Sequence, residues 1–403
     1  MKSSGGDTSY HFDPPRTNRC GCLPAIRIGR YEVFPGSPLG KSETALVREA
    51  FDPMNGHAVV IKSLAAGLSD AASRAAIAET VALAHVRHDN VVRLLQVMYS
   101  PWQTVHLVLE HCAGGSLLDA IQNGPLPEAT AACYFAQLVA ALSACHEQGV
   151  CHRDIKPDNI LLVRERSSEG CASNGSEALT VRLADFGFAR RVACLPHNGR
   201  LVGGGPSNLS ENIQDERLHT MCGTPHFAAP EVLRGAGYDG KSADAWSTGC
   251  VLYAMLEGAL PFDDHPIGAL VAQVMAARYP PLHEAVSNEA VDLLSKLLVA
   301  DPRSRPALRD VHRHGWFHLC GRDPNLALPH APGLAGLPGA SRVSSVFMAQ
   351  SVCASGGTAT MLCPATPTST EQGACTLDVA GWTNGEVLPR LRMRFGDTFA
   401  GTL

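Results

Sequence analysis

Two short polar motifs near the middle of the chain constrain its fold and its chemistry more than any other feature. Residues 152–159 read His-Arg-Asp-Ile-Lys-Pro-Asp-Asn, and residues 185–187 read Asp-Phe-Gly. In this order they supply a carboxylate that can accept a hydroxyl proton, oxygens that can hold a metal ion, and a lysine that can lie against a phosphate. Phosphoryl transfer needs such a set, because its catalysis consists mainly of positioning and of charge neutralisation.

The motifs resemble those of the eukaryotic protein kinase family, and the resemblance covers roughly Tyr31 to His318 in the expected order. It implies an α+β, bilobal protein kinase fold. A small β-rich N-lobe would hold one main helix, and a larger C-lobe would be mainly helical. It also implies ATP and Mg²⁺ as cofactors and proteins as substrates. Lys156 fits the serine/threonine form of the catalytic loop, so serine and threonine hydroxyls are the expected acceptors.

The resemblance assigns a role to each polar residue of these motifs. Asp154 is the expected catalytic base, and Lys156 is expected to steady the transferring phosphate. Asn159 and Asp185 are the expected ligands of Mg²⁺. Thr224 follows Gly223 and precedes a proline, and its hydroxyl is expected to bridge Asp154 and Lys156.

A lysine–glutamate pair is expected to hold the nucleotide phosphates. Lys62 closes the sequence Val-Val-Ile-Lys, which is similar to the VAIK strand of the family. Its compact ammonium group suits the α- and β-phosphates. Glu79, on the helix expected next, is the anionic partner. Outside this family frame, a Lys–Glu pair is usually a surface contact of little energetic value.

The loop expected to cover the phosphates departs from the family pattern of three glycines. It begins at Leu39 and Gly40, but Ser42 and Ala45 replace the second and third glycines. Glycine at such positions lets backbone amides approach the phosphates without a Cβ in the way. A further departure is Val60, where the family usually has alanine beside the adenine. These changes predict weaker nucleotide affinity, and they leave a pseudokinase scaffold as the alternative function.

The remaining nucleotide contacts follow from the resemblance. Leu109 stands at the gatekeeper position, and the backbones of Glu110 and Cys112 are expected to face the adenine. Val47 and Leu161 would lie on either side of its ring.

Residues 218–231 look most like the AMP-activated and calcium/calmodulin-dependent kinase branch. In that branch a threonine at the position of Thr220 is phosphorylated by an upstream kinase. Arg153 and Arg190 occupy the basic-pocket positions and would pair with the phosphothreonine. The sequence therefore predicts a phosphorylation switch at Thr220, with an ordinary loop threonine as the alternative.

Glycine-rich and proline-rich stretches mark the expected domain boundaries. The parts, in chain order, are an N-terminal tail at 1–30, an N-lobe at 31–112, a C-lobe at 113–318 with insertions near 164–179 and 195–216, and a low-complexity tail at 319–403. Hydrophobic periodicity predicts the regular elements. Strands are expected at 45–50, 58–63, 91–96 and 105–109, and helices at 69–84, 117–122, 128–148, 243–257, 267–277 and 290–298.

Composition narrows the class of protein further. A net charge of −5 argues against nucleic-acid binding through a broad basic surface. The 14 cysteines are dispersed without a CxxC pair, which indicates reduced thiols. Neither a secretory signal nor a membrane span is evident. We expect a cytoplasmic protein, with the nucleus as an alternative, that meets protein substrates and an upstream activating kinase.

Overall fold

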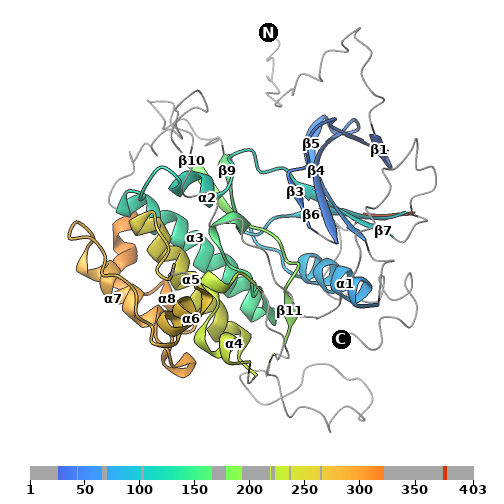
Figure 1. The fold of residues 1–403 in the computed structure, drawn as a ribbon. Helices are drawn as coiled ribbons and strands as arrows, with labels where there is room; N and C mark the ends of the chain where they lie inside the picture. Colours follow the sequence, from blue (N-terminus) through green and yellow to red (C-terminus); the bar gives the residue numbers. More distant parts are fainter. Residues whose placement is uncertain are drawn as a thin grey trace, which may run out of the picture. The chain divides into compact units, whose positions relative to one another are not determined.

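The computed structural model describes residues 26–42, 44–65, 70–100, 104–165, 178–192, 218, 223–235, 237–263, 266–321 and 375–378 (Figure 1). The chain divides into two compact units. The small unit contains the described residues up to Ala84, Arg93–His111 and the strand Cys375–Asp378. The large unit contains His85–Val92 and the described residues from Cys112 to Gly321.

The small unit is an antiparallel sheet with one helix. Its strands follow the order β1-β2-β4-β5-β7-β6-β12, and β3 pairs with β4. The strands are β1 (Ile26–Ile28), β2 (Tyr31–Val33), β3 (Gly40–Lys41), β4 (Ala45–Asp52), β5 (His57–Ala65), β6 (Leu94–Tyr99), β7 (Thr104–Glu110) and β12 (Cys375–Asp378). Helix α1 (Asp70–His85) follows β5 in the chain.

Local sequence explains the tight β4–β5 hairpin. The Asp52 carboxylate accepts a hydrogen bond from the Met54 amide at 3.0 Å, and Gly56 adopts a positive φ of 70°. Aspartate and glycine favour turns for these two reasons. The core of this unit includes Tyr31, Ile61 and Met98, each at most 1% exposed. The hairpin thus sets the register of the two strands that carry the expected nucleotide contacts.

Two strands of this sheet lie in segments expected to be tails. Strand β1 lies within residues 1–30 and pairs with β2, with Ile26 opposite Val33. Strand β12 lies within residues 319–403 and pairs with β6. Strand β1 has three residues and strand β12 has four, which is too short for a periodic pattern, so only the partner strand reveals each of them.

The large unit is mainly helical. Its longer helices are α3 (Glu128–Glu147), α5 (Gly240–Glu257), α6 (Ile267–Met275) and α7 (Asn288–Leu297). Its short helices are α2 (Leu117–Ile121), α4 (Pro230–Arg234), α8 (Leu308–Val311) and the 3₁₀ turns η2 (Pro157–Asn159), η3 (Pro225–Phe227), η4 (Pro302–Ser304) and η5 (Gly315–Gly321). Two pairs of short antiparallel strands are also present: β8 (Val150–Cys151) with β11 (Arg190–Arg191), and β9 (Ile160–Glu165) with β10 (Ala178–Leu183).

Two helices form the centre of the large unit. Helix α5 is buried along almost its whole length. Its ends are set locally, because Asp239 caps its start and Gly258 ends it in a left-handed conformation. Helix α3 is long and apolar enough to cross a membrane by length and composition, but 61% of that apolar window is buried inside the protein. Such burial is typical of a core helix in a folded domain.

Some element boundaries differ from the sequence expectation. The strand expected at 91–96 begins instead at Leu94, because the Val92 amide donates to the Leu183 carbonyl in the large unit. Helix α5 begins at Gly240 rather than 243, because the Asp239 side chain accepts from the amides of Lys241 and Ser242. The short helices α4 and α8 had no periodicity long enough to be predicted. These differences lie at element ends, where local capping decides.

Candidate functional site

The small unit contributes a buried ion pair. Nζ of Lys62 on β5 lies 2.6 Å from a carboxylate oxygen of Glu79 on α1. The two residues are 8% and 4% exposed. Each charge therefore compensates the other in a poorly hydrated place, where removal of one partner would take away a close compensating charge. This is the pair that the sequence predicted.

The expected nucleotide contacts of the sheet lie on one face. Lys62 pairs with Val47 on β4 and with Leu107 on β7, while Val60 pairs with Leu109. Residues that alternate along a strand, or that pair across strands, point to the same side. The side chains that were expected to contact the nucleotide therefore lie on one face of the sheet. They are Ala45, Val47, Val60, Lys62 and Leu109.

The loop between β3 and β4 is held by its own serine. The Ser42 amide donates to the Ala45 carbonyl at 2.8 Å, and the Ser42 hydroxyl accepts from the Ala45 amide at 3.0 Å. Serine in place of glycine thus closes a small turn with its side chain. Leu39, at the start of this loop, is 59% exposed, and Gly40 pairs with Val47.

The expected adenine-facing segment follows β7. The Glu110 amide donates to the Arg93 carbonyl at 3.0 Å, and its carboxylate accepts from the Arg93 amide. Cys112 is half-buried and belongs to the large unit. Leu161, also half-buried, lies on β9 in the large unit. The predicted contacts are therefore divided between the two units.

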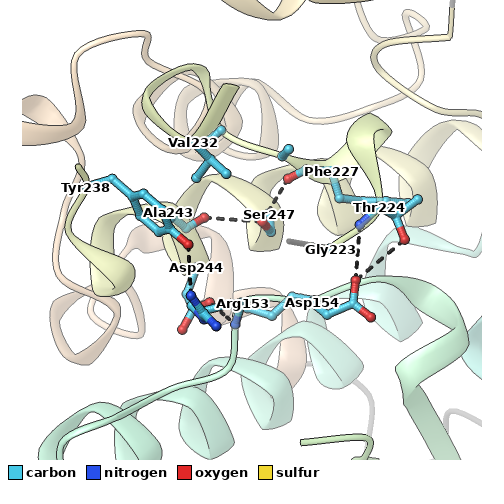
Figure 2. Close-up of a pocket in the computed structure, with 13 residues that line it drawn as sticks. Arg153, Asp154, Gly223, Thr224, Phe227, Val232, Tyr238, Ala243, Asp244 and Ser247 are labelled. Carbon is cyan, nitrogen blue, oxygen red and sulfur yellow. Dashed lines mark hydrogen bonds between the residues drawn. The ribbon is translucent and has the colours of Figure 1, made fainter. Parts of the chain in front are cut away.

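Asp154 is the centre of a hydrogen-bonded group in the large unit, and Figure 2 shows its contacts with Thr224. One of its carboxylate oxygens accepts from the Asn159 amide at 3.0 Å and lies 3.1 Å from Nζ of Lys156. The other oxygen accepts from the backbone amide of Thr224 at 3.2 Å. Lys156 also donates to the Thr224 hydroxyl at 3.1 Å. The bridge expected of Thr224 is present, and all four predicted residues meet at one carboxylate.

Asp244, a buried aspartate on α5, holds the backbone of the catalytic loop. Asp244 accepts from the backbone amides of His152 at 2.9 Å and Arg153 at 2.8 Å, and from the ring of His146 at 2.8 Å. Burial alone would raise the pKa of the Asp244 carboxyl, but these hydrogen bonds and nearby positive charge lower it below its ordinary value. Asp244 stays ionised and fixes the backbone that presents Asp154.

The segment that carries Asp185 is tied to the same loop. The Ala184 amide donates to the Asn159 carbonyl at 2.8 Å. The rings of His152 and Phe186 meet edge to face, with centroids 4.8 Å apart. Asp185 itself is exposed and has a positive φ of 58°, a conformation rare for a residue with a side chain. Its neighbours are thus packed inward while its carboxylate remains accessible.

The oxygen set formed by Asn159 and Asp185 suits a hard divalent cation. Asn159 directs its amide nitrogen at Asp154, which leaves the amide oxygen as its possible ligand atom. Asp185 offers an exposed carboxylate. Oxygen ligands of this kind are the ones that Mg²⁺ prefers.

Gly223 shows why glycine precedes Thr224. It has φ of 92°, and an added Cβ would lie 2.8 Å from the Arg153 carbonyl oxygen and 3.3 Å from the Asp154 carboxylate. A side chain there would displace the catalytic loop. The hollow next to Gly223 is bordered by Asp154 and Thr224 at one end and by Tyr238 and Val232 at the other (Figure 2).

The predicted regulatory residues are only partly described. Thr220 lies outside the described residues. Arg153 is buried, and its guanidinium donates to the Phe188 carbonyl at 2.8 Å and to the Tyr238 hydroxyl at 3.2 Å. Arg190 is half-buried on β11 and donates to the Ala189 carbonyl. The Phe188 carbonyl and the Tyr238 hydroxyl are uncharged, so they do not neutralise the charge of Arg153.

Sequence reasoning missed two supporting residues, His146 and Tyr238. His146 binds Asp244, and Tyr238 binds Arg153, from positions far away in the chain. Neither stands in a recognisable motif. Glu231 and Arg305 form a buried ion pair in the same unit, with two contacts of 2.6 and 2.8 Å.

His146, Cys151 and Asp244 could formally hold a metal ion, because their ligand atoms lie within 4.8 Å of one another. Their hydrogen bonding argues otherwise. The Asp244 oxygens already accept from two amides and an imidazole. Burial raises the pKa of the Cys151 thiol well above its ordinary value, so the thiol stays protonated. The cluster therefore serves to support the loop.

Comparison with known proteins adds an independent line of support. Residues 35–317 match the family described as the protein kinase domain. CBL-interacting protein kinase 16 of Oryza sativa subsp. japonica is 37% identical over 72% of this chain and 57% of its own length. CBL-interacting serine/threonine-protein kinase 24 of Arabidopsis thaliana is 36% identical over 73% of this chain and 58% of its own length. A probable serine/threonine-protein kinase of Dictyostelium discoideum is 33% identical over 70% of this chain and 30% of its own length. The chain thus spans less than two thirds of the length of these relatives.

Proposed function

This chain belongs to the protein kinase domain family, and we propose from that premise that it is a protein serine/threonine kinase acting on ATP. The observation that carries the proposal is the set of contacts around the Asp154 carboxylate, which joins Asn159, Lys156 and Thr224. Several relatives are named serine/threonine-protein kinases, which supports the same acceptor class.

In the proposed reaction, Asp154 receives the proton of the substrate hydroxyl. Its position is fixed by the hydrogen bonds of Asn159 and Thr224, so the carboxylate is oriented before the substrate arrives. Lys156 lies between this carboxylate and the Thr224 hydroxyl, where its charge can also face the transferring phosphoryl group. Preorganised charge of this kind accounts for most of the catalysis in phosphoryl transfer.

Mg²⁺, held by Asn159 and Asp185, would neutralise charge on the phosphate oxygens. Lys62, oriented by Glu79, would bind the α- and β-phosphates of the nucleotide. The apolar side chains on the same sheet face, Val47 and Val60, would contact the adenine.

The test is transfer of radiolabelled phosphate from ATP to generic protein substrates, followed by phosphoamino-acid analysis. We expect phosphoserine and phosphothreonine, and no signal from Asp154→Asn. A wild-type protein that binds Mg·ATP but transfers no phosphate would favour the pseudokinase scaffold instead. Phosphotyrosine as the main product would contradict the acceptor class.

We further propose that phosphorylation of Thr220 activates the enzyme. Support comes from Arg153, which stands directly before the catalytic base and whose buried guanidinium donates to an uncharged carbonyl and an uncharged hydroxyl. A phosphothreonine would supply the missing negative charge and order the segment before Gly223. After treatment with an upstream kinase, Thr220→Ala should stay at basal activity, whereas Ser210→Ala should be activated like the wild type. Full activation of Thr220→Ala would contradict the switch.

A further inference from the structure

The C-terminal tail contributes a strand to the small-unit sheet. Strand β12 lies antiparallel to β6 at the end of the strand order, and Figure 1 draws it in red. The aligned pairs are Cys375 with Tyr99, Thr376 with Met98, Leu377 with Val97, and Asp378 with Gln96. Residues 322–374, which precede the strand, lie outside the described part of the chain. The pairing links a distant segment to the folded domain through backbone groups.

The direction of the backbone groups on β6 follows from the hydrogen bonds around it. The Ser100 amide donates to the Thr104 carbonyl at 3.0 Å, so Ser100 faces β7. Successive residues of an antiparallel strand face opposite neighbours. Met98 and Gln96 therefore also face β7. Beyond Gln96 an irregularity between Leu94 and Gln96 shifts the alternation by one residue, so Arg93 also faces β7 and accepts from the Glu110 amide. Val97 and Tyr99 face away from β7.

Strand β12 can form backbone hydrogen bonds with the β6 residues that face away from β7. Val97 is paired with Leu377 and Tyr99 with Cys375, so these are the pairs that exchange backbone hydrogen bonds. Thr376 and Asp378 direct their amides away from β6. Only alternate residues of the tail strand are therefore needed for its attachment.

The edge of β6 that faces away from β7 needs hydrogen-bond partners for its backbone groups. Val97 and Met98 are fully buried, and Gln96 is held by the Tyr31 hydroxyl at 2.6 Å, so the strand is a rigid part of the unit. Rigid edge strands with unpaired amides and carbonyls attract other extended segments. Addition of a strand to such an edge is a general way to bind a peptide.

We propose that the β6 edge is a docking site for the chain's own C-terminal segment, residues 375–378, which binds in cis as an added strand. Recognition is through the backbone of residues 375 and 377. The tail is then an intramolecular ligand of the small unit. Another extended peptide, including the tail of a second copy, can bind this edge only by displacing β12. This inference is independent of the proposed catalytic activity.

Two neighbouring proline substitutions in the full-length protein test the docking. Leu377→Pro removes an amide that donates to β6, whereas Thr376→Pro removes an amide that faces away from β6, where proline is tolerated. The measurement is residue-resolved hydrogen exchange of the β6 amides. Gln96 and Met98 serve as internal controls, because they donate to β7 in every variant.

With Leu377→Pro we expect the amides of Val97 and Tyr99 to exchange about tenfold faster or more, while Gln96 and Met98 are unchanged. Thr376→Pro should leave all four amides protected. The docking is overturned if Val97 and Tyr99 exchange freely in the wild type, or if the two prolines have equal effects. Sedimentation decides between the sources of the strand. A monomer with protected amides supports docking in cis, and a dimer that Leu377→Pro dissociates would overturn it.

Discussion

The catalytic loop of the large unit and the phosphate-covering loop of the small unit are built in opposite ways. Asp154 is 5% exposed and its loop is held by a buried aspartate on a central helix. Ser42 is exposed, and its turn is held by two contacts to a residue three positions away. The catalytic loop, which carries the expected proton acceptor, is fixed by tertiary contacts. The phosphate-covering loop, which would act through its backbone amides, is held by local hydrogen bonds. Two of its expected glycines are replaced.

The largest effect should follow from removal of the proton acceptor. Asp154→Asn keeps the size of the side chain but lowers its basicity, so kcat should fall about 10²- to 10⁴-fold. The free energy of unfolding should change much less. Steady-state kinetics and urea denaturation measure the two quantities. A kcat within threefold of the wild type would show that this loop is not the catalytic one.

Isolation of a buried charge should have the next largest effect. Glu79→Gln leaves the Lys62 ammonium buried without its carboxylate, which should cost about 3–5 kcal/mol of stability in the small unit. Glu49→Gln is the matched control, because the Glu49 side chain is 42% exposed and its ion pair is with His111. Urea denaturation compares them. An equal loss of unfolding free energy in both variants would show that burial of the Lys62–Glu79 pair does not determine its contribution to stability.

The supporting aspartate should make the catalytic loop sensitive to acid. Because the Asp244 pKa is lower than its ordinary value of 3.8, the stability that the carboxylate adds is present above that pH and is lost as pH falls below it. Asp244→Asn should cost about 1–3 kcal/mol at neutral pH. The gap between variant and wild type should narrow as pH falls toward about 3. A gap that stays constant over this range would contradict the ionised state of Asp244.

The smallest effect should come from the phosphate-covering loop. Ser42→Gly releases the Ala45 amide from the serine hydroxyl and makes it available to phosphate. The KM for ATP should then fall about two- to tenfold, which corresponds to one net hydrogen bond. Ser37→Gly, in the preceding turn, is the control and should leave KM unchanged. A higher KM for Ser42→Gly would mean that the serine preorganises the loop.

The catalytic residues could be predicted from the sequence because they stand in motifs with fixed spacing. Residues 152–159 carry three of them, and the remaining ones lie in short motifs that follow. Lys62 and Glu79 were also predictable, since a strand and a helix at the expected positions carry them. Long periodic helices such as α3 were predicted to within a residue or two at their ends.

Other features could not be predicted, because they depend on contacts between segments far apart in the chain. His146 and Asp244 are separated by 98 positions, and no local pattern relates them. Strand β12 is four residues long and lies in a segment whose composition predicts no structure. Only its alignment with β6 makes it a strand.

The sequence by itself determined which chemical groups are present and in what order, because motif spacing and periodicity are local properties of the chain. Tertiary structure alone decided how those groups are held. The buried carboxylate of Asp244 fixes the catalytic loop, and the β6 edge gives the tail its place. The physical reason is that a hydrogen bond between distant segments is formed only after folding has already brought them together.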